Sequence, residues 1–170
     1  NKIINDLLSL VKMDKTEGSM DISAVDINEL LETTLKRLRP IARKRDIEVV
    51  LESLRPVTAE VDEVKISQIF TNLVENAIKY NRVDGIVTVS AKREKNEVVL
   101  TVSDTGNGID EAFREQIFEP FFRVDKSRSR ELGGVGLGLA MVREVVRVHD
   151  GTIEVYTNKH LGTTFEVKMS

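Results

Sequence analysis

Two asparagines and a lysine recur at helical spacing in the segment NLVENAIKY, residues 72–80. In an α-helix, Asn72, Asn76 and Lys79 lie on one face together with Tyr80, and the apolar residues between them face the other way. An amide oxygen is a hard ligand that suits Mg²⁺, and one protein ligand suffices because Mg²⁺ usually keeps waters and phosphate oxygens. Lys79 would add a positive charge nearby. The segment therefore predicts a magnesium-binding helix face, although a solvated polar face gives the same pattern.

An acidic residue, Asp104, ends the apolar run VVLTVSD and enters a turn that carries Gly106 and Gly108. Glycines in such a turn permit positive φ and let a ligand approach the backbone closely. A carboxylate at the end of a strand can accept a hydrogen bond from an exocyclic amine such as N6 of adenine, and it would repel the O6 acceptor of guanine. The turn therefore suits an adenine base, although an Asp-Thr-Gly turn without any ligand is also common.

Four glycines stand within six residues, from Gly133 to Gly138, directly before an apolar helical pattern. Backbone N–H groups at a helix N-terminus bind phosphate, so this run could cradle a polyphosphate. It does not fit the dinucleotide pattern, which needs G-x-G-x-x-G after an apolar strand, or the Walker pattern, which needs Gly-Lys-Ser/Thr. A flexible loop is the alternative interpretation.

Four basic residues precede the glycines: Arg123 at the end of the phenylalanine-rich segment IFEPFFRVD, and Lys126, Arg128 and Arg130 after it. Such charge runs are usually solvated surface. Beside a phosphate cradle they could also form a mobile lid whose cations meet a polyphosphate.

The two histidines, His149 and His160, are expected in structural or surface roles. His149 lies near a predicted helix C-terminus, where a partial positive charge is favourable. No nucleophile–base triad, metal-binding histidine pair or catalytic carboxylate pair stands out.

Hydrophobic periodicity predicts the elements that must position these segments. We expect helices over residues 1–13, from the N-cap Asp26 to about 41, over 62–80 and over 136–148, and strands over 47–51, 57–61, 86–93, 98–104 and in the closing hairpin of TIEVYT and TTFEVKM. The hairpins exclude a purely parallel, doubly wound sheet. The predicted fold class is α+β, a two-layer sandwich with a mixed, largely antiparallel sheet covered by helices and preceded by a helical stub.

Two of these helices carry apolar stripes that we expect to be buried. The predicted buried positions are Leu30, Leu31, Thr34, Leu35, Leu38 and Ile41 in the helix after Asp26, and Val64, Ile69, Leu73 and Ile78 in the helix after Asp62.

Length and composition limit the function further. The chain has 170 residues, 41% apolar and 31% charged, which suits one globular domain with a short extension. A net charge of −3 argues against a nucleic-acid binder, the absence of cysteine suits a reducing, cytoplasmic setting, and the apolar runs are too short to span a membrane. Because the chain begins with Asn, we expect a fragment of a longer protein, whose missing upstream part could include a membrane anchor.

Five segments in order resemble the boxes of the ATP-binding catalytic domain of sensor histidine kinases, in the GHKL superfamily with its Bergerat fold. They are QIFTNLVENAIKY for the N box, DTGNGI for the first glycine box, IFEPFFRVD for the F box, GGVGLGL for the second glycine box and GTTF for the last one. The likeness covers about residues 26–170. INDLLSLVKMD also resembles the end of the dimerisation helix, which implies a helix end and linker over 1–19 and the catalytic domain over 20–170.

The resemblance implies a role for each matching residue. Asn76 would bind Mg²⁺, Asp104 would read the adenine amine, and Tyr80 would lie by the adenine or ribose. The remaining implied ATP contacts are Asn72, Lys79, Gly106, Gly108, Ile109, Arg123, Lys126, Arg128, Gly134, Val135, Gly136, Leu137, Gly138 and Thr164. Two positions depart from the pattern, since Asn107 stands where an aliphatic residue is common and Asp150 where glycine is common.

The same resemblance favours phosphoryl transfer over hydrolysis. Hydrolytic members of the superfamily carry a Glu four residues before the metal-binding Asn, where this chain has Asn72, which is a poor general base. Glu75 points about 100° away around the helix. The expected reaction moves the γ-phosphoryl of Mg-ATP to a His on dimerisation helices that this chain lacks, for relay to the receiver domain of a response regulator. A non-catalytic nucleotide-binding or partner-binding module, a hydrolytic ATPase and a serine kinase of the anti-sigma type are the alternatives.

Overall fold

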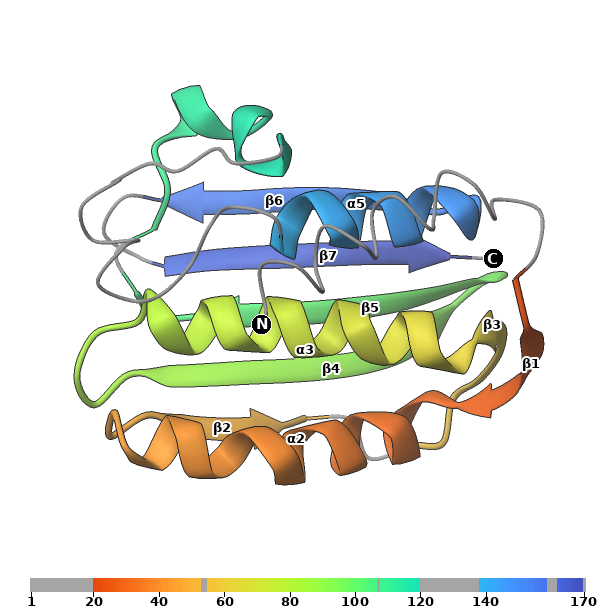
Figure 1. Cartoon of the computed structure of the whole chain (residues 1–170), viewed down its shortest axis with the longest axis horizontal. Coiled ribbons are helices and arrows are strands. Elements are labelled where there is room, and N and C mark those ends of the chain that lie inside the picture. The colour runs from red at the N-terminus through yellow and green to blue at the C-terminus, as the bar shows by residue number, and fades with distance from the viewer. Residues whose placement is uncertain (1–19, 53–54, 107, 120–137, 159–161, 170) are drawn as a thin grey trace, which may run out of the picture.

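The structure is a computed structural model that describes residues 20–52, 55–106, 108–119, 138–158 and 162–169 (Figure 1). Its elements are β1 (Ile22–Asp26), α2 (Ile27–Arg43), β2 (Glu48–Leu51), β3 (Thr58–Asp62), α3 (Glu63–Lys79), β4 (Ile86–Glu94), β5 (Glu97–Asp104), the short 3-10 turns η1 (Glu111–Phe113) and η2 (Gln116–Phe118), α5 (Gly138–Val148), β6 (Thr152–Asn158) and β7 (Gly162–Met169). The helix and linker predicted within residues 1–19 lie outside the described residues.

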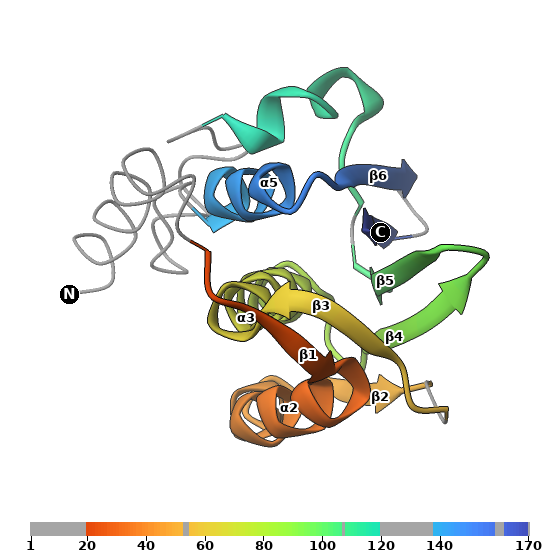
Figure 2. The ribbon, with the colours of Figure 1, turned by 90° about the vertical axis from the view of Figure 1, so that its right-hand side faces the viewer.

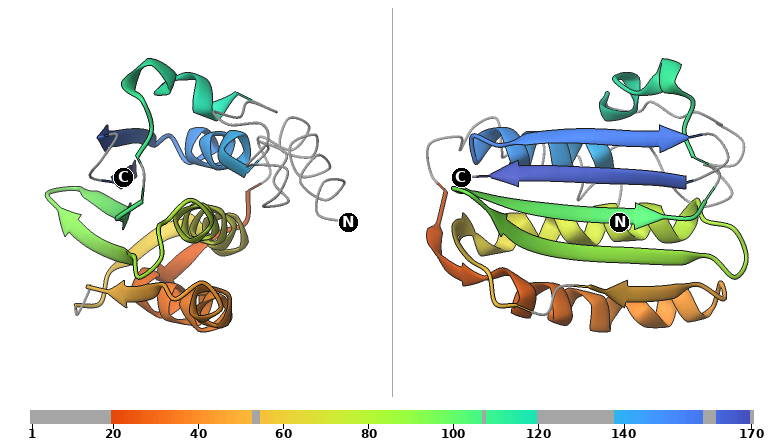
Figure 3. Two further views of the ribbon diagram at one scale, coloured as in Figure 1. Left: turned by 90° about the vertical axis from the view of Figure 1, so that its left-hand side faces the viewer. Right: turned by 180° about the vertical axis from the view of Figure 1, so that it is seen from behind.

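The strands form a five-stranded sheet in the order β2-β4-β5-β7-β6 and a separate two-stranded ribbon of β1 and β3. Strands β2 and β4 run parallel, and the other neighbours in both sheets are antiparallel. Helices α2, α3 and α5 cover one face of the five-stranded sheet (Figures 2 and 3). The predicted α+β class and the two hairpins are therefore confirmed, and β1 is an element that the sequence analysis did not predict.

Two aspartates begin the helices α2 and α3, as the sequence predicts. The Asp26 side chain accepts a hydrogen bond from the Glu29 backbone N–H at 3.2 Å, and the Asp62 side chain accepts one from the Lys65 N–H at 3.2 Å. Each carboxylate satisfies an N–H group that the first helical turn leaves without an internal partner. These caps fix where α3, the helix that carries Asn72 and Asn76, starts.

Both helices bury an apolar stripe, but two predicted positions are wrong. Ile41 is 45% exposed and Val64 is 70% exposed. In α2 the buried stripe continues from Leu38 to Ala42, one turn further, so Ile41 faces outward next to Pro40. Val64 lies in the first turn of α3, two residues before buried Ile66 and so on the opposite side of the helix. Among the described helices, none has the length and apolar content needed to cross a membrane.

The central strand β5 carries its terminal acid toward the helices. Leu100 and Val102 are buried, and alternation puts Asp104 on the same face as these two residues. Ser103 lies on the other face next to Thr101, and both of these polar side chains are partly buried. The core between sheet and helices therefore ends at Asp104, at the edge of the sheet next to the C-terminal end of α3.

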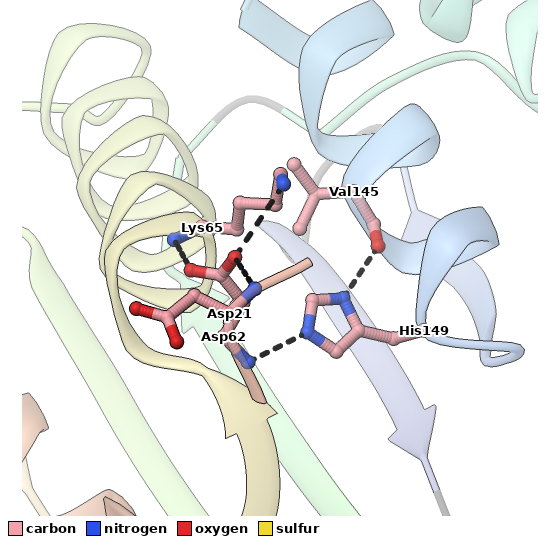
Figure 4. Close-up of polar contacts among 5 residues, drawn as sticks. All are labelled: Asp21, Asp62, Lys65, Val145 and His149. Atoms are coloured by element: carbon pink, nitrogen blue, oxygen red, sulfur yellow. Dashed lines mark hydrogen bonds and ion pairs between the residues drawn. The ribbon is translucent and has the colours of Figure 1, made fainter. Parts of the chain in front are cut away.

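His149 holds the end of α5 against the start of α3 (Figure 4). Its Nε2 accepts a hydrogen bond from the backbone N–H of Asp62 at 3.1 Å, and because that N–H can only donate, Nδ1 carries the proton and donates to the Val145 carbonyl at 2.8 Å. The Asp62 carboxylate also accepts from the Asp21 N–H at 3.1 Å and from Lys65 Nζ at 3.4 Å. The predicted structural role of His149 is confirmed, and His160 lies outside the described residues.

The end of α5 explains one departure from the family pattern. Asp150 follows the helix with φ 56°, in the left-handed region that glycine adopts most easily and that Asp tolerates better than most residues. Gly151 then donates to the Val146 carbonyl at 3.0 Å, which closes the helix end. Aspartate at position 150 therefore allows the same helix termination that glycine would.

Candidate functional site

The carboxylate of Asp104 lies partly buried at the end of β5. The Gly106 backbone N–H donates to its Oδ1 at 2.8 Å. Burial raises the pKa of Asp104 from 3.8 to about 6, although hydrogen bonds from the backbone N–H groups of Gly106 and Thr163 act in the opposite direction. At neutral pH the group is therefore an ionised acceptor held where water solvates it poorly. Such a group would gain from a ligand that donates a hydrogen bond.

The turn after Asp104 has no room for a side chain at Gly106. A Cβ on Gly106 would lie 2.5 Å from the carbonyl oxygen of Tyr80, the residue that ends α3, and 3.0 Å from Asp104 Oδ1. Gly108 has φ 72°, which favours glycine. The predicted positive φ is confirmed at Gly108, whereas Gly106 is required because the turn packs directly against the end of α3.

The far side of this turn is fixed by β6. The Thr157 hydroxyl accepts from the Ile109 N–H at 2.5 Å and donates to the Ile109 carbonyl at 2.8 Å. The Ile109 side chain is partly buried and packs against the core. Sequence reasoning did not identify Thr157, because the contact joins residues 48 positions apart.

Gly162 brings the start of β7 against Asp104. It has φ 93°, and a Cβ there would overlap the Asp104 carbonyl oxygen. Any larger residue would push the two strands apart at the position of the carboxylate. Glycine at the first position of the last glycine box is therefore required by the close approach of β7 to Asp104.

The polar face of α3 is not simply a solvated surface. Asn72 is buried with 8% exposure, Asn76 and Lys79 are partly buried, and Tyr80 is 37% exposed. A Cβ on Gly138, the first residue of α5, would lie 3.5 Å from Asn72 Oδ1. The structure therefore brings Asn72 beside the start of α5 and Tyr80 beside Gly106, so that α3 contacts both other segments predicted to bind a ligand.

One predicted residue lies on the wrong face of the sheet. The cross-strand register pairs Ser103 with Thr164 and Asp104 with Thr163. Directly opposite residues share a face, and the two hydroxyl oxygens of Ser103 and Thr164 lie 2.8 Å apart, away from the helices. Thr163 is 5% exposed and lies on the face of Asp104. Strand alternation from buried Phe165 could have indicated Thr163 from sequence.

Part of the predicted site lies outside the described residues. These are Arg123, Lys126, Arg128, Gly134, Val135, Gly136 and Leu137, together with Asn107. Their implied roles stay predictions. Of the F box, Phe118 is buried and meets Phe165 edge to face with ring centroids 6.2 Å apart, and the Arg143 guanidinium lies 5.6 Å from its ring centroid. This part of the F box belongs to the core.

The fold and site together define an ATP-binding domain of the Bergerat class. Helices cover one face of a mixed sheet, an acid ends the central strand, and the asparagine-bearing helix meets it at a glycine turn. The family model described as "Histidine kinase-, DNA gyrase B-, and HSP90-like ATPase" matches residues 61–170. The chain belongs to this family.

Curated relatives of this chain include sensor kinases. The chain is 34% identical over 167 residues to the sensor-like histidine kinase SenX3 of Mycobacterium tuberculosis, which covers 98% of this chain and 41% of SenX3. It is 34% identical over 172 residues to the sensor protein kinase WalK of Staphylococcus saprophyticus, covering 99% of this chain and 28% of WalK. The chain thus spans less than half the length of these curated relatives.

Solved structures agree with this relationship. The catalytic domain of histidine kinase ThkA matches with a TM-score of 0.78 at 28% identity, covering 88% of this chain and 95% of that one. Full-length ShkA in complex with AMPPNP matches with a TM-score of 0.85 at 27% identity, over 99% of this chain and 35% of that one. ThkA in complex with the response regulator protein TrrA matches with a TM-score of 0.73 at 26% identity, over 99% of this chain and 49% of that one.

Proposed function

We propose that this chain is the ATP-binding catalytic domain of a two-component sensor histidine kinase. It transfers the γ-phosphoryl of Mg-ATP to a His on adjoining dimerisation helices, for relay to an Asp of a response regulator in the cytoplasm. The observation that carries the proposal is the partly buried acid Asp104 at the end of β5, packed through Gly106 against the end of α3. The sensor kinases among its relatives and the ThkA–TrrA complex support the relay.

Asp104 would select the base. Its carboxylate accepts from the adenine N6 amine, which adds a donor to the backbone N–H groups of Gly106 and Thr163 that already reach it. Guanine presents an acceptor at the same place and leaves the charge unpaired. Tyr80, whose backbone carbonyl lies beside Gly106 and whose side chain is 37% exposed, would cover the adenine or ribose.

Asn76 would hold the metal. Its side chain is partly buried on α3, one helical turn beyond Asn72, and supplies the hard amide oxygen that Mg²⁺ accepts as a single protein ligand. Mg²⁺, when bound, neutralises charge on the triphosphate oxygens. Asn72 lies beside the start of α5, where a helix N-terminus favours phosphate, and Lys79 adds positive charge one turn beyond Asn76.

The chemistry of α3 favours transfer to a side chain over hydrolysis. The position four residues before Asn76 is occupied by an amide, which cannot take a proton from water as a carboxylate does. The residues of this chain therefore bind and orient the nucleotide, while the accepting imidazole comes from the dimerisation helices. A hydrolytic ATPase of the same family is the second candidate, and it needs a general base that Asn72 does not provide.

A chimera tests the proposal. This chain replaces the stretch of SenX3 that aligns with it over 167 residues, which joins it to the dimerisation helices expected of a sensor histidine kinase. With ATP labelled at the γ-phosphoryl, we expect label on the phosphoacceptor His of those helices. The controls are the same chimera with that His replaced and with Asn76→Ala, and both should stay unlabelled.

The competing outcome is release of labelled phosphate. Two results together would support the hydrolytic ATPase and overturn the kinase proposal. They are ATP turnover of about 1 s⁻¹ by this chain alone, the low end of ordinary enzyme rates, and no label on the dimerisation helices of the chimera.

A further inference from the structure

The turn between α3 and β4 and the turn after β5 are joined by a side chain that no predicted role uses. Asn81 follows the last residue of the N box and is 7% exposed. Its Oδ1 accepts from the Arg82 N–H at 2.9 Å, and its Nδ2 donates to the Ile86 carbonyl at 3.2 Å. A Cβ on Gly85 would overlap this amide, so the loop closes around it.

Thr105, the residue after Asp104, completes the same network. Its hydroxyl donates to Asn81 Oδ1 at 3.2 Å and accepts from the Ile86 N–H at 2.9 Å. The Thr105 backbone N–H donates to the Ile86 carbonyl at 3.2 Å. One hydroxyl and one amide therefore hold the end of β5, the start of β4 and the residue after α3 together.

This network adjoins the Asp104 turn, which meets the nucleotide in the proposed function. Asp104 precedes Thr105, and Gly106 follows it in contact with the Tyr80 carbonyl and with Asn81 Cα, 2.5 and 3.1 Å from a Cβ built on Gly106. A carboxylate on a free turn would lose its orientation, because a backbone shift of a fraction of an ångström spoils a hydrogen bond. The Asn81–Thr105 pair fixes the turn to α3, which carries the metal-binding amide.

We propose that Asn81 and Thr105 are positioning residues for base recognition: they hold the Asp104 turn against the end of α3, so that the adenine-reading carboxylate and the Asn76 face keep one fixed relation. The inference rests on the proposed ATP-binding role. It assigns neither residue a contact with the nucleotide, and it predicts that their loss weakens selection of the base more than binding of the triphosphate.

The test compares ATP with purine riboside triphosphate, which lacks the N6 amine and keeps the triphosphate. Dissociation constants for both are measured by calorimetry on the full 170-residue chain. The variants are Thr105→Val, which removes the hydroxyl at constant shape, and Thr105→Ser, which retains it. Thr34→Val is the matched control, because it removes the hydroxyl of a buried threonine, which donates to the Leu30 carbonyl at 2.9 Å within α2.

We expect Thr105→Val to weaken ATP binding about tenfold, the value of one hydrogen bond, and to change binding of the analogue less than about twofold. Thr105→Ser should restore the ratio, and Thr34→Val should lower the melting temperature without changing the ratio. If Thr105→Val proves unfolded, Thr105→Ala replaces it, since it removes the hydroxyl without placing an apolar branch in the network.

Two results would overturn the inference. If Thr105→Val lowers stability but keeps the wild-type ratio of ATP to analogue affinity, as Thr34→Val does, the network has only a structural role. If the wild-type chain binds both nucleotides equally, Asp104 does not read the amine, and the adenine-binding role in the proposed function fails along with this inference. The wild-type measurement thus separates the two failures.

Discussion

Replacing Asp104 by Asn separates the binding role of this residue from any role in the fold. Asn has nearly the same size and keeps an oxygen that can accept from the Gly106 N–H. It removes the negative charge and puts an NH₂ donor in place of one carboxylate oxygen. The substitution therefore changes the electrostatics of the site with little change in packing.

The folded state should become more stable. Burial raises the pKa of Asp104 from 3.8 to about 6, so ionising it in the folded chain costs about 3 kcal/mol relative to the unfolded chain, at 1.36 kcal/mol for each pH unit. The sign follows from linkage: the folded state holds the proton more tightly, so the wild type loses stability as pH rises from 3.8 to about 6 and carries the full cost above that range. Asp104→Asn lacks this cost, and its advantage should grow from near zero to at most about 3 kcal/mol across the same interval.

ATP binding should be abolished by the same change. A hydrogen bond to a charged acceptor is worth about 1.5–3 kcal/mol, and an N6 amine facing an NH₂ donor adds about 1–3 kcal/mol for the unpaired group. Together these predict affinity lower by at least about a hundredfold. Wild-type affinity for ATP, relative to purine riboside triphosphate, should also fall as pH drops below about 6, because the carboxyl is then protonated.

Calorimetric titration with ATP and chemical denaturation over a range of pH test both parts. Asp62→Asn is the matched control, since burial opposes ionisation there too, but hydrogen bonds from Asp21 and Lys65 and the charge of Lys65 keep the pKa of Asp62 below its ordinary value. The ionised Asp62 carboxylate therefore stabilises the folded state at pH values above its ordinary pKa, and Asp62→Asn should lose stability at neutral pH. Unchanged ATP affinity in Asp104→Asn would refute the base-reading role. A large loss of stability of Asp104→Asn at neutral pH would refute the conclusion that the ionised Asp104 carboxylate destabilises the folded state.

Three further predictions follow from the same geometry. Asn76→Ala should remove mainly the Mg²⁺-dependent part of ATP affinity, so that calorimetry in a chelator gives equal constants for variant and wild type; an equal loss with and without Mg²⁺ would count against a metal ligand. The isolated chain should hydrolyse ATP far more slowly than about 1 s⁻¹ in a phosphate-release assay, because it lacks a general base at Asn72. Gly162→Ala should destabilise the fold by about 1–3 kcal/mol in urea and weaken ATP binding, since its Cβ overlaps the Asp104 carbonyl at φ 93°; wild-type stability would contradict the close approach of β7.

Local pattern predicted most of the elements, and distance along the chain explains what it missed. The caps Asp26 and Asp62 and the alternation in β4 and β5 are local signals, and the structure confirms them. Strand β1 has three exposed residues at its start and pairs with β3, from Ile22 opposite Asp62 to Asp26 opposite Thr58, so nothing near it in sequence marks it as a strand. The parallel pairing of β2 with β4 is non-local in the same way.

The same distinction holds for the site. The acid, the glycines around it and the asparagine face could be predicted because each is a short run of residues with a recognisable chemistry. The contacts that hold them were not predictable, since Asn81 meets Thr105 across 24 positions and Ile109 meets Thr157 across 48. Thr163, by contrast, could be predicted in place of Thr164, because it lies two residues from buried Phe165 and therefore on the same face of β7.

The central claim is that Asn76 and Asp104 meet one nucleotide. Nuclear magnetic resonance tests it most directly, with ATP and Mg²⁺ titrated into the labelled chain while the backbone amide of Gly106, bonded to Asp104, and the side-chain amide of Asn76 are followed. We predict that both signals shift with a single dissociation constant and that omitting Mg²⁺ reduces mainly the Asn76 response. Two different constants, or a shift at only one of the two amides, would contradict a shared site.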